Sequence, residues 1–366
     1  MILTVTGCIV IFLTFLRFAV AFVNWISRPY LPYVARDRSR LPSLSVLIPV
    51  RNEEKNIGTL LGSLALLPYD KAEIIVYDDG STDSTAEVVC ACARIDTRVR
   101  CIRGDELPEG WTGKNHACHR LAEEAKNDYL LFLDADVTVG DDLLKRAVSF
   151  ASRHRLALLS MFPRQKMRST GEKIVVPFMF RILLSLLPLL LIRRCRWSSF
   201  SAANGQMMLF HGATYRRYRF HEKVRDRMAE DIEIMRLIKR SRLRGDTLVG
   251  RKEIECRMYR SYAEGVNGFS RNIFSMFGNS LAFLLLYAVT GLVGWFILLF
   301  LPLQFAAAYF FMVIALNGMI ALTSRQRLKE SLLWLLPGIA AFYHIAFLAL
   351  SRRATRNFEW KGRKIR

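Results

Sequence analysis

The chain has 366 residues, a hydrophobic fraction of 52% and a formal net charge of +21 at neutral pH. This length is enough for one full domain and additional segments. So positive a charge often indicates nucleic acid as a partner, but its distribution argues otherwise. Between Leu143 and His221 the only acid is Glu172, and the many Lys and Arg residues flank an apolar segment. This combination suits anionic lipid headgroups, so we expect a membrane partner and no nucleic acid.

Residues 1–27 predict an N-terminal transmembrane helix. They carry one charged side chain, Arg17, and are long enough to cross a bilayer. A cleaved signal peptide is the alternative, but the segment ends without a small-residue cleavage site. By the positive-inside rule, the basic residues that follow predict a cytoplasmic central domain. These residues are Arg28, Arg36, Arg38 and Arg40.

Residues 279–351 predict a second membrane region. No charged side chain occurs in it up to Ser324, a length that suits two spans. Residues 331–351 form a third apolar stretch, and the sequence leaves open whether it crosses the membrane or makes a re-entrant hairpin around Pro337-Gly338. The basic tail, residues 352–366, favours the cytoplasmic side, which a full third span would contradict. We therefore expect a multi-pass protein of the cytoplasmic membrane.

A further apolar segment, residues 174–192, interrupts the central region. It contains Arg181 and two prolines. A true crossing would place Asp136 and Asp231 on opposite sides of a bilayer, although both belong to the same set of acidic motifs. We therefore expect this segment to lie in the membrane plane as a docking element.

The central domain, residues 42–275, alternates apolar runs with amphipathic segments. This alternation predicts an α/β fold with a mostly parallel sheet. The expected strands are Leu44–Val50, Ile74–Tyr77, Val99–Ile102 and Tyr129–Leu133. The expected helices are Asn56–Leu67, Ser84–Ala93 and Asn115–Lys126. Ligands of such sheets gather beyond the carboxyl ends of the strands.

Charged side chains follow three of these strands at that edge: Arg51, Glu53, Asp78, Asp79, Asp134 and Asp136. Taken alone, the Asp78 and Asp134 motifs are also compatible with capped turns. Asp134 and Asp136 should point to opposite faces of an extended chain. One would then bind an ion directly, while the other would orient a ribose or a water. Hard oxygen ligands of this kind suit Mg²⁺ or Mn²⁺ bridging the phosphates of a nucleotide.

Together these motifs resemble the signature of family 2 glycosyltransferases, which have the GT-A fold. The resemblance is carried by Val46–Glu54, Ile74–Asp83, Gly110–Lys114, Leu131–Val137, Asn204–Met208, Glu230-Asp231 and Gly268–Asn272. The stretch around Trp111 and the tail from Trp360 to Arg363 are similar to the carotenoid (diaponeurosporenoate) and hopanoid-associated glycosyltransferases. The resemblance implies a GT-A domain between terminal membrane helices.

The resemblance also implies roles for individual residues. Asp134 and Asp136 would form the DxD motif, with Asp136 the better metal ligand. Asp231, beside Glu230, would be the general base of an inverting transfer, although both acids also suit the start of a helix over Ile232–Arg240. Nucleotide-sugar-binding roles fall on Pro49, Arg51, Glu53, Asp78, Asp79, Lys114 and Asp134. Acceptor-binding roles fall on Gly205, Gln206 and Arg257.

The chain departs from the family in one respect. The Gln-x-x-Arg-Trp element of processive members is replaced by Arg257-Met258-Tyr259-Arg260, which favours one transfer per acceptor. We therefore expect a membrane-bound, non-processive, metal-dependent hexosyltransferase that moves a sugar from a UDP-sugar to an isoprenoid-type lipid. A polyprenyl-phosphate sugar synthase or a short-polysaccharide synthase of the same fold is the alternative. A membrane protein that binds lipid or nucleotide without catalysis is disfavoured because all the expected acids are present.

Overall fold

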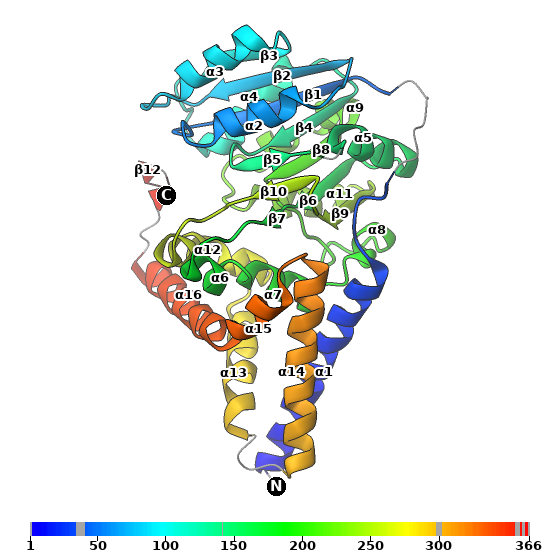
Figure 1. Ribbon diagram of the computed structural model, residues 1–366, viewed down its shortest axis with the longest axis vertical. Coiled ribbons are helices and arrows are strands. Elements are labelled where there is room, and N and C mark those ends of the chain that lie inside the picture. The colour runs from blue at the N-terminus through cyan, green and yellow to red at the C-terminus, as the bar shows by residue number, and fades with distance from the viewer. Residues whose placement is uncertain are drawn as a thin grey trace. The chain divides into compact units, whose positions relative to one another are not determined.

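The computed structural model describes residues 2–33, 41–140, 142–297, 302–355, 359–360 and 363–364 (Figure 1). The chain divides into two units. The sheet unit comprises Tyr30–Lys166 and Leu191–Arg257. The helical unit comprises Met1–Pro29, Met167–Leu190 and Met258–Arg366. Arg36, Arg38 and Arg40 and parts of the expected basic tail lie outside the described residues.

A seven-stranded mixed sheet forms the centre of the sheet unit, in the order β3-β2-β1-β4-β8-β6-β9 (Figure 1). β8 runs antiparallel to both of its neighbours, and the other neighbouring pairs are parallel. These strands are β1 (Leu44–Val50), β2 (Ala72–Asp78), β3 (Val99–Arg103), β4 (Tyr129–Leu133), β6 (Leu158–Phe162), β8 (Met207–His211) and β9 (Gly245–Val249). A smaller sheet contains β5 (Val137–Val139), β10 (Ile254–Cys256) and β7 (Arg164–Gln165). The expected α/β class with a mostly parallel sheet is confirmed.

Burial explains why these runs are strands. β4 is buried at every position, and β1 at every position except Pro49. The pairing of β1 with β4 ends at Leu47. Pro49 therefore lies beyond the last β4 partner, where its missing N–H breaks no hydrogen bond of that ladder. The sheet thus opens after Leu47, next to the strand ends that carry the predicted site.

Helices flank the sheets in the same unit (Figure 1). They are α2 (Ile57–Ala65), α3 (Thr85–Ile95), α4 (Gly113–Glu124), α5 (Leu143–His154), α8 (Leu190–Arg194), α9 (Gly212–Tyr218), α10 (Phe220–Lys223) and α11 (Glu230–Arg240). α4 packs on β1 and β2. Its N-cap is Thr112, whose side chain accepts a hydrogen bond from the Asn115 N–H at 3.4 Å. The helix begins two residues before the predicted Asn115, so Lys114 lies in its first turn.

The helical unit contains long apolar helices. α1 (Ile2–Ser27) packs against α13 (Leu281–Ile297) and α14 (Leu303–Thr323), as Figure 1 shows. Three segments are long and apolar enough to cross a membrane: Val5–Ser27, Leu303–Thr323 and Leu335–Arg353. α13 meets the same test only together with α12 (Tyr262–Met276), as a pair bent by 114°. The remaining elements are α6 (Thr170–Val175), α7 (Phe178–Leu186), α15 (Leu328–Leu333), α16 (Leu335–Thr355), β11 (Glu359–Trp360) and β12 (Arg363–Lys364).

The third apolar stretch, residues 331–351, is divided at Trp334 between the end of α15 and most of α16. α16 continues unbroken through Pro337 and Gly338. Pro337 lies in the first turn, where a helix tolerates proline because the N–H groups there have no partner within the helix. Pro337 and Gly338 therefore lie inside α16, and the break in this stretch comes before them, at Trp334. Whether α16 crosses a membrane stays a prediction.

The segment expected to dock on the membrane is fixed to α1 within the helical unit. The side-chain amide nitrogen of Asn24 donates to the carbonyl oxygens of Leu184 at 3.0 Å and Leu187 at 2.9 Å. The Asn24 amide oxygen accepts from the Leu189 N–H at 2.8 Å. These bonds satisfy carbonyls at the end of α7, which have no partner within the helix. Membrane docking by this segment stays a prediction.

Candidate functional site

The loop after β2 is organised around two buried aspartates. Asp78 Oδ1 accepts a hydrogen bond from the Ser81 N–H at 3.0 Å. The Arg51 guanidinium donates to the Asp79 carbonyl oxygen, and its Nη1 lies 3.8 Å from the Asp79 carboxylate. Gly80, which follows Asp79, has φ +65°, and a Cβ there would lie 3.6 Å from Arg51 Nη1. The turn therefore holds Arg51 against the carboxyl end of β2, as the sequence predicts.

The negative charge of Glu53, which follows β1, acts on the two acids that follow β4. Its N–H donates to Thr85 Oγ1 at 2.8 Å, and its carboxylate accepts from Asn56 Nδ2 at 2.7 Å. Burial is the main cause that raises the pKa of both Asp134 and Asp136, and the Glu53 charge adds to it. Glu53 thus lies near both acids of the DxD motif, at one edge of the sheet.

Lys114 stands between two carboxylates. Its Nζ lies 2.9 Å from Asp134 Oδ1 and 3.0 Å from Glu230 Oε1. Burial alone would lower the pKa of Lys114, but the charges of Asp134 and Glu230 outweigh it and raise the pKa well above its usual value. A Cβ at Gly205 would lie 2.7 Å from Lys114 Nζ and 3.0 Å from Glu230 Oε1. A side chain at position 205 would therefore have to displace the ends of Lys114 and Glu230 from this ion pair.

Asp136 contacts a different set of partners. Gln206 Nε2 donates to its two carboxylate oxygens at 3.2 and 3.0 Å, and Cys256 Sγ lies 3.3 Å from Oδ2. Burial, and then the charge of Asp134, raises the pKa of Asp136 to about 7. Gln206 Oε1 is buried, and no hydrogen-bond partner for it occurs in the part of the chain that the structure describes. Within the described part of the chain, the hydrogen bonds to the Asp136 carboxylate therefore come from the neutral groups of Gln206 and Cys256.

These residues fit a divalent cation that takes part of its coordination from a ligand. No group of three or more His, Cys, Asp or Glu side chains among the described residues is arranged to hold a metal by itself. Asp134 and Asp136 do turn toward different partners, as their spacing predicts. A cation beside Asp136 would offset the charge that burial disfavours. Its remaining ligands would be oxygens of a bound diphosphate and waters.

Asp231 lies in the first turn of α11, beside Glu230. Its Oδ2 accepts from the Gly205 N–H at 3.0 Å, and its Oδ1 accepts from the Ile232 N–H at 2.7 Å. Burial, followed by the Glu230 charge, raises the pKa of Asp231 to about 7. The carboxylate thus combines an N-terminal helix position with the protonation behaviour of a base that works near neutral pH.

Arg257 is a predicted site residue that takes part in none of the contacts described above. It directly follows Cys256, so its backbone lies on the Asp136 side of the site, and its side chain is half-buried. Pro49 is placed by the sheet register, opposite Tyr77 of β2. All other predicted residues belong to the contacts described above, within the sheet unit.

Sequence reasoning missed Asn115 and Cys256. The fully buried Asn115 donates from Nδ2 to the carbonyl oxygens of Val224 at 2.8 Å and Arg227 at 3.0 Å, just before Glu230. A signal for Asn115 existed, because its spacing puts it on the same helical face as the apolar residues Cys118 and Ala122 of α4. No local pattern distinguishes Cys256 from the other cysteines.

Comparisons with known proteins concern the family and the fold of this chain. A model of the glycosyl transferase family 2 matches residues 45–216. The chain is 35% identical over 130 residues to the 4,4'-diaponeurosporenoate glycosyltransferase of Staphylococcus haemolyticus strain JCSC1435, covering 35% of this chain and 34% of the relative. It is 42% identical over 96 residues to the enzyme of that name from Staphylococcus aureus strain bovine RF122 / ET3-1, covering 26% and 24%. The matched segments therefore span about a third or less of these curated relatives.

A solved structure extends the likeness in fold. The mannosyltransferase PcManGT from Pyrobaculum calidifontis, in complex with GDP-Man and Mn²⁺, aligns with a TM-score of 0.58 at 18% identity, covering 94% of this chain and 99% of that one. This similarity concerns the fold alone, and it confirms the GT-A architecture. Residues 45–216, from β1 into α9, therefore form a glycosyl transferase family 2 domain.

Proposed function

We propose that the protein is a membrane-bound inverting glycosyltransferase. It transfers a sugar from a UDP-sugar to an isoprenoid-type lipid, once per acceptor. The names of the curated relatives support a carotenoid-like acceptor. The replacement of the Gln-x-x-Arg-Trp element by Arg257–Arg260 supports a single transfer. The candidate spans support a membrane location, and the basic residues after α1 support a cytoplasmic catalytic domain.

The observation that carries the proposal is the position of Asp231. Its carboxylate is held by two backbone N–H groups, and its pKa is raised to about 7. At neutral pH a large fraction is therefore ionised and basic enough to accept a proton. Lys114, Asp134 and Glu230 lie next to it through Gly205. A general base and a cation thus lie close together. The base can take the proton of a neutral acceptor, and the cation can offset the charge of the departing diphosphate.

Each group then has a definite task. Asp231 takes the proton of the acceptor hydroxyl while the acceptor oxygen bonds to the anomeric carbon of the sugar. The bond from that carbon to the diphosphate oxygen breaks on the opposite face, so the configuration inverts. Lys114 offsets negative charge on the departing diphosphate. A Mg²⁺ or Mn²⁺ ion held by Asp136 and Asp134 would supply further charge neutralisation there when bound.

The loop after β2 binds the nucleotide in this proposal. Asp78 recognises the uracil, Asp79 supports it, and Pro49, Arg51 and Glu53 line the nucleotide. The buried, hydrogen-bonded state of both aspartates makes this loop rigid before the donor arrives. Such preorganisation lowers the entropy lost on binding.

The test measures transfer by the purified full chain in detergent with Mn²⁺. A panel of UDP-sugars is offered together with two acceptors, an isoprenoid alcohol and 4,4'-diaponeurosporenoate. Asp231→Asn should lower the rate on the alcohol by about 10²–10⁴-fold, the usual contribution of a general base. The loss on the carboxylate acceptor should be smaller, because an ionised carboxylate has no proton to give up.

The matched control is Glu233→Gln. Glu233 lies in the first turn of the same helix and pairs with Arg236 outside the site, so its loss should leave both rates unchanged. Wild-type turnover of the alcohol by Asp231→Asn would exclude Asp231 as the base. Absence of transfer from every UDP-sugar to either acceptor would overturn the proposed function.

A further inference from the structure

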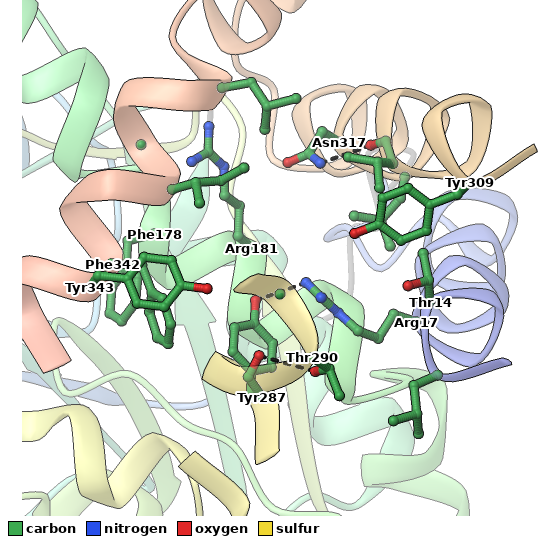
Figure 2. Close-up of a pocket in the computed structure, with 17 residues that line it drawn as sticks. Thr14, Arg17, Phe178, Arg181, Tyr287, Thr290, Tyr309, Asn317, Phe342 and Tyr343 are labelled. Atoms are coloured by element: carbon green, nitrogen blue, oxygen red, sulfur yellow. Dashed lines mark hydrogen bonds between the residues drawn. The ribbon is translucent and has the colours of Figure 1, made fainter. Parts of the chain in front are cut away.

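A cavity of about 100 Å³ lies inside the helical unit, between α1, α7, α13, α14 and α16 (Figure 2). One buried water needs about 10–15 Å³ on the same measure. The cavity therefore has room for several waters or for one group the size of a phosphate. α1, α14 and α16 contain the three candidate membrane spans. The proposed sugar transfer uses none of the residues that line this cavity.

Two arginines contribute to the wall. Arg17 of α1 donates to the Tyr287 hydroxyl at 2.8 Å, and its guanidinium lies 4.4 Å from the centre of the same ring. Arg181 of α7 packs its guanidinium against Gly338, where an added Cβ would clash with Nη1. Figure 2 shows both arginines among the side chains that surround the cavity. None of the described lining residues supplies a carboxylate to either arginine.

Two guanidinium groups beside an apolar cavity cost free energy when no anion compensates their charge. Removing an ion from water costs several kcal/mol when no opposite charge compensates it, and ionisable groups among membrane helices usually have a functional partner. The ring of Tyr287 offsets part of this cost for Arg17. Arg181 lines the same cavity together with apolar residues, among them Phe178 and Ile339. An anion entering the cavity would compensate Arg181 most strongly.

The other side chains of the cavity wall indicate the chemistry of the part of the ligand that is not anionic. The apolar side chains of the wall include Leu13, Val313, Leu316, Leu335, Ile339 and Phe342, and hydroxyl or amide groups come from Thr14, Thr290, Tyr309, Asn317 and Tyr343. A guanidinium binds phosphate through two parallel hydrogen bonds, whereas the apolar side chains favour hydrocarbon. A free inorganic anion would use the arginines and the polar groups but would leave the apolar part of the wall without a partner. The wall therefore matches a molecule with one anionic end and an apolar chain.

We propose that this cavity binds the phosphate-bearing end of an amphipathic lipid, with Arg181 as the main electrostatic contact and Arg17 as the second. The phosphate of the bound lipid offsets the positive charges of Arg181 and Arg17. This site is separate from the proposed donor and base residues, so its occupancy can be measured without any sugar transfer.

The test is calorimetric titration of the purified full chain in nonionic detergent with dihexanoylphosphatidic acid. Dihexanoylphosphatidylcholine and inorganic phosphate are titrated in parallel. The phosphatidic acid should bind at least about tenfold more tightly than either comparison ligand. Equal binding of the phosphatidylcholine would mean a purely apolar cavity, and equal binding of inorganic phosphate would mean a small-ion site. Either result overturns the proposal.

Variants locate the binding in this cavity. Arg181→Gln should weaken the phosphatidic acid by at least about tenfold, and Arg181→Lys by less, because lysine keeps the charge but loses the bidentate contact. Ile339→Phe keeps both arginines and fills space in the cavity, so it should also weaken binding. Arg327→Gln is the matched control, since this side chain is 80% exposed and pairs with Glu330. Unchanged affinity in folded Arg181→Gln or folded Ile339→Phe would overturn the proposal.

Discussion

Lys114 Nζ lies 3.0 Å from Glu230 Oε1, so the first turn of α4 and the first turn of α11 meet through an ion pair. Asp134 lies on the other side of the same ammonium group, at 2.9 Å. One cation thus holds together two helices and the end of β4. The same cation is the group proposed to meet the donor diphosphate.

Replacing Lys114 by Met should damage both binding and stability. We expect the dissociation constant for UDP to rise about tenfold or more, because one charge–phosphate contact is lost. The free energy of unfolding should fall by about 2–3 kcal/mol, because Asp134 and Glu230 then face each other without a cation. Titration with UDP and thermal unfolding in detergent measure the two effects.

Lys145→Gln is the control for this prediction. Lys145 is exposed and lies 3.9 Å from Asp142, so its replacement should change neither quantity. Wild-type UDP affinity in Lys114→Met would show that Lys114 holds the helices together but does not bind the donor.

The second prediction concerns Gly205. A Cβ at this position would lie 2.7 Å from Lys114 Nζ and 3.0 Å from Glu230 Oε1. Gly205→Ala should therefore displace the ion pair and lower kcat, by about 10²-fold if the reacting groups shift by 1 Å. The comparison is Gly62→Ala, in α2, where nothing lies within 4 Å of the added atom. That change should leave kcat unaltered and raise stability by about 0.5–1 kcal/mol, because alanine favours the helix. Equal kcat values for the two variants would contradict this view of Gly205.

Local patterns predict the strands and the acids at their ends well. The apolar run Ile74–Tyr77 is the centre of β2, and Asp78 ends that strand as expected. Such features depend on neighbours in the chain, because periodicity reflects the local conformation and its burial. The start of α4 was predicted two residues late because Asn115 looked like the first helical residue. The Thr112 cap determines the actual start.

Contacts between distant segments could not be predicted in the same way. β8 enters the sheet antiparallel between β4 and β6, and an apolar run gives no information on its partner strand. Cys256 approaches Asp136 because β10 pairs with β5, the strand that directly follows the DxD motif. These positions result from tertiary pairing, and a single sequence contains no direct record of it.

The third prediction concerns Asn115, which we expect to be a positioning residue. Its side-chain nitrogen donates to the carbonyl oxygens of Val224, Arg225 and Arg227, and the chain reaches Asp231 four residues later. Asn115→Ala should lower stability by about 2–3 kcal/mol, from three lost bonds of about 1 kcal/mol each. It should also lower kcat more than it changes the KM for the donor, because the base moves while the nucleotide loop does not.

Asn127→Ala provides the comparison for Asn115. Asn127 makes one side-chain bond, to Glu73 at 3.3 Å, away from the site. Its loss should leave kcat and KM unchanged. If Asn115→Ala lowers stability but keeps the wild-type kcat below its melting temperature, Asn115 has a structural role only.

The pH dependence of transfer tests the pKa of Asp231. Burial and the Glu230 charge raise this pKa to about 7, and only the ionised carboxylate accepts a proton. On an alcohol acceptor, the rate should therefore fall about tenfold per pH unit below pH 7. The sign for stability is opposite. Because the folded pKa lies above the usual 3.8, the protonated carboxyl stabilises the fold at low pH, and this contribution is lost as the pH rises through about 7.

Asp231→Asn separates this group from the other acids of the site. Its residual rate on the alcohol should lack the acidic decline, because the amide does not titrate in this range. Thermal unfolding of the variant in detergent should likewise lose the part of the pH dependence between about 4 and 7 that Asp231 contributes. An acidic decline that persists unchanged in Asp231→Asn would assign the titration to another group. A wild-type midpoint near pH 4 would show that the carboxylate is as exposed to water as an ordinary surface acid, and the buried base proposed for this site would then be wrong.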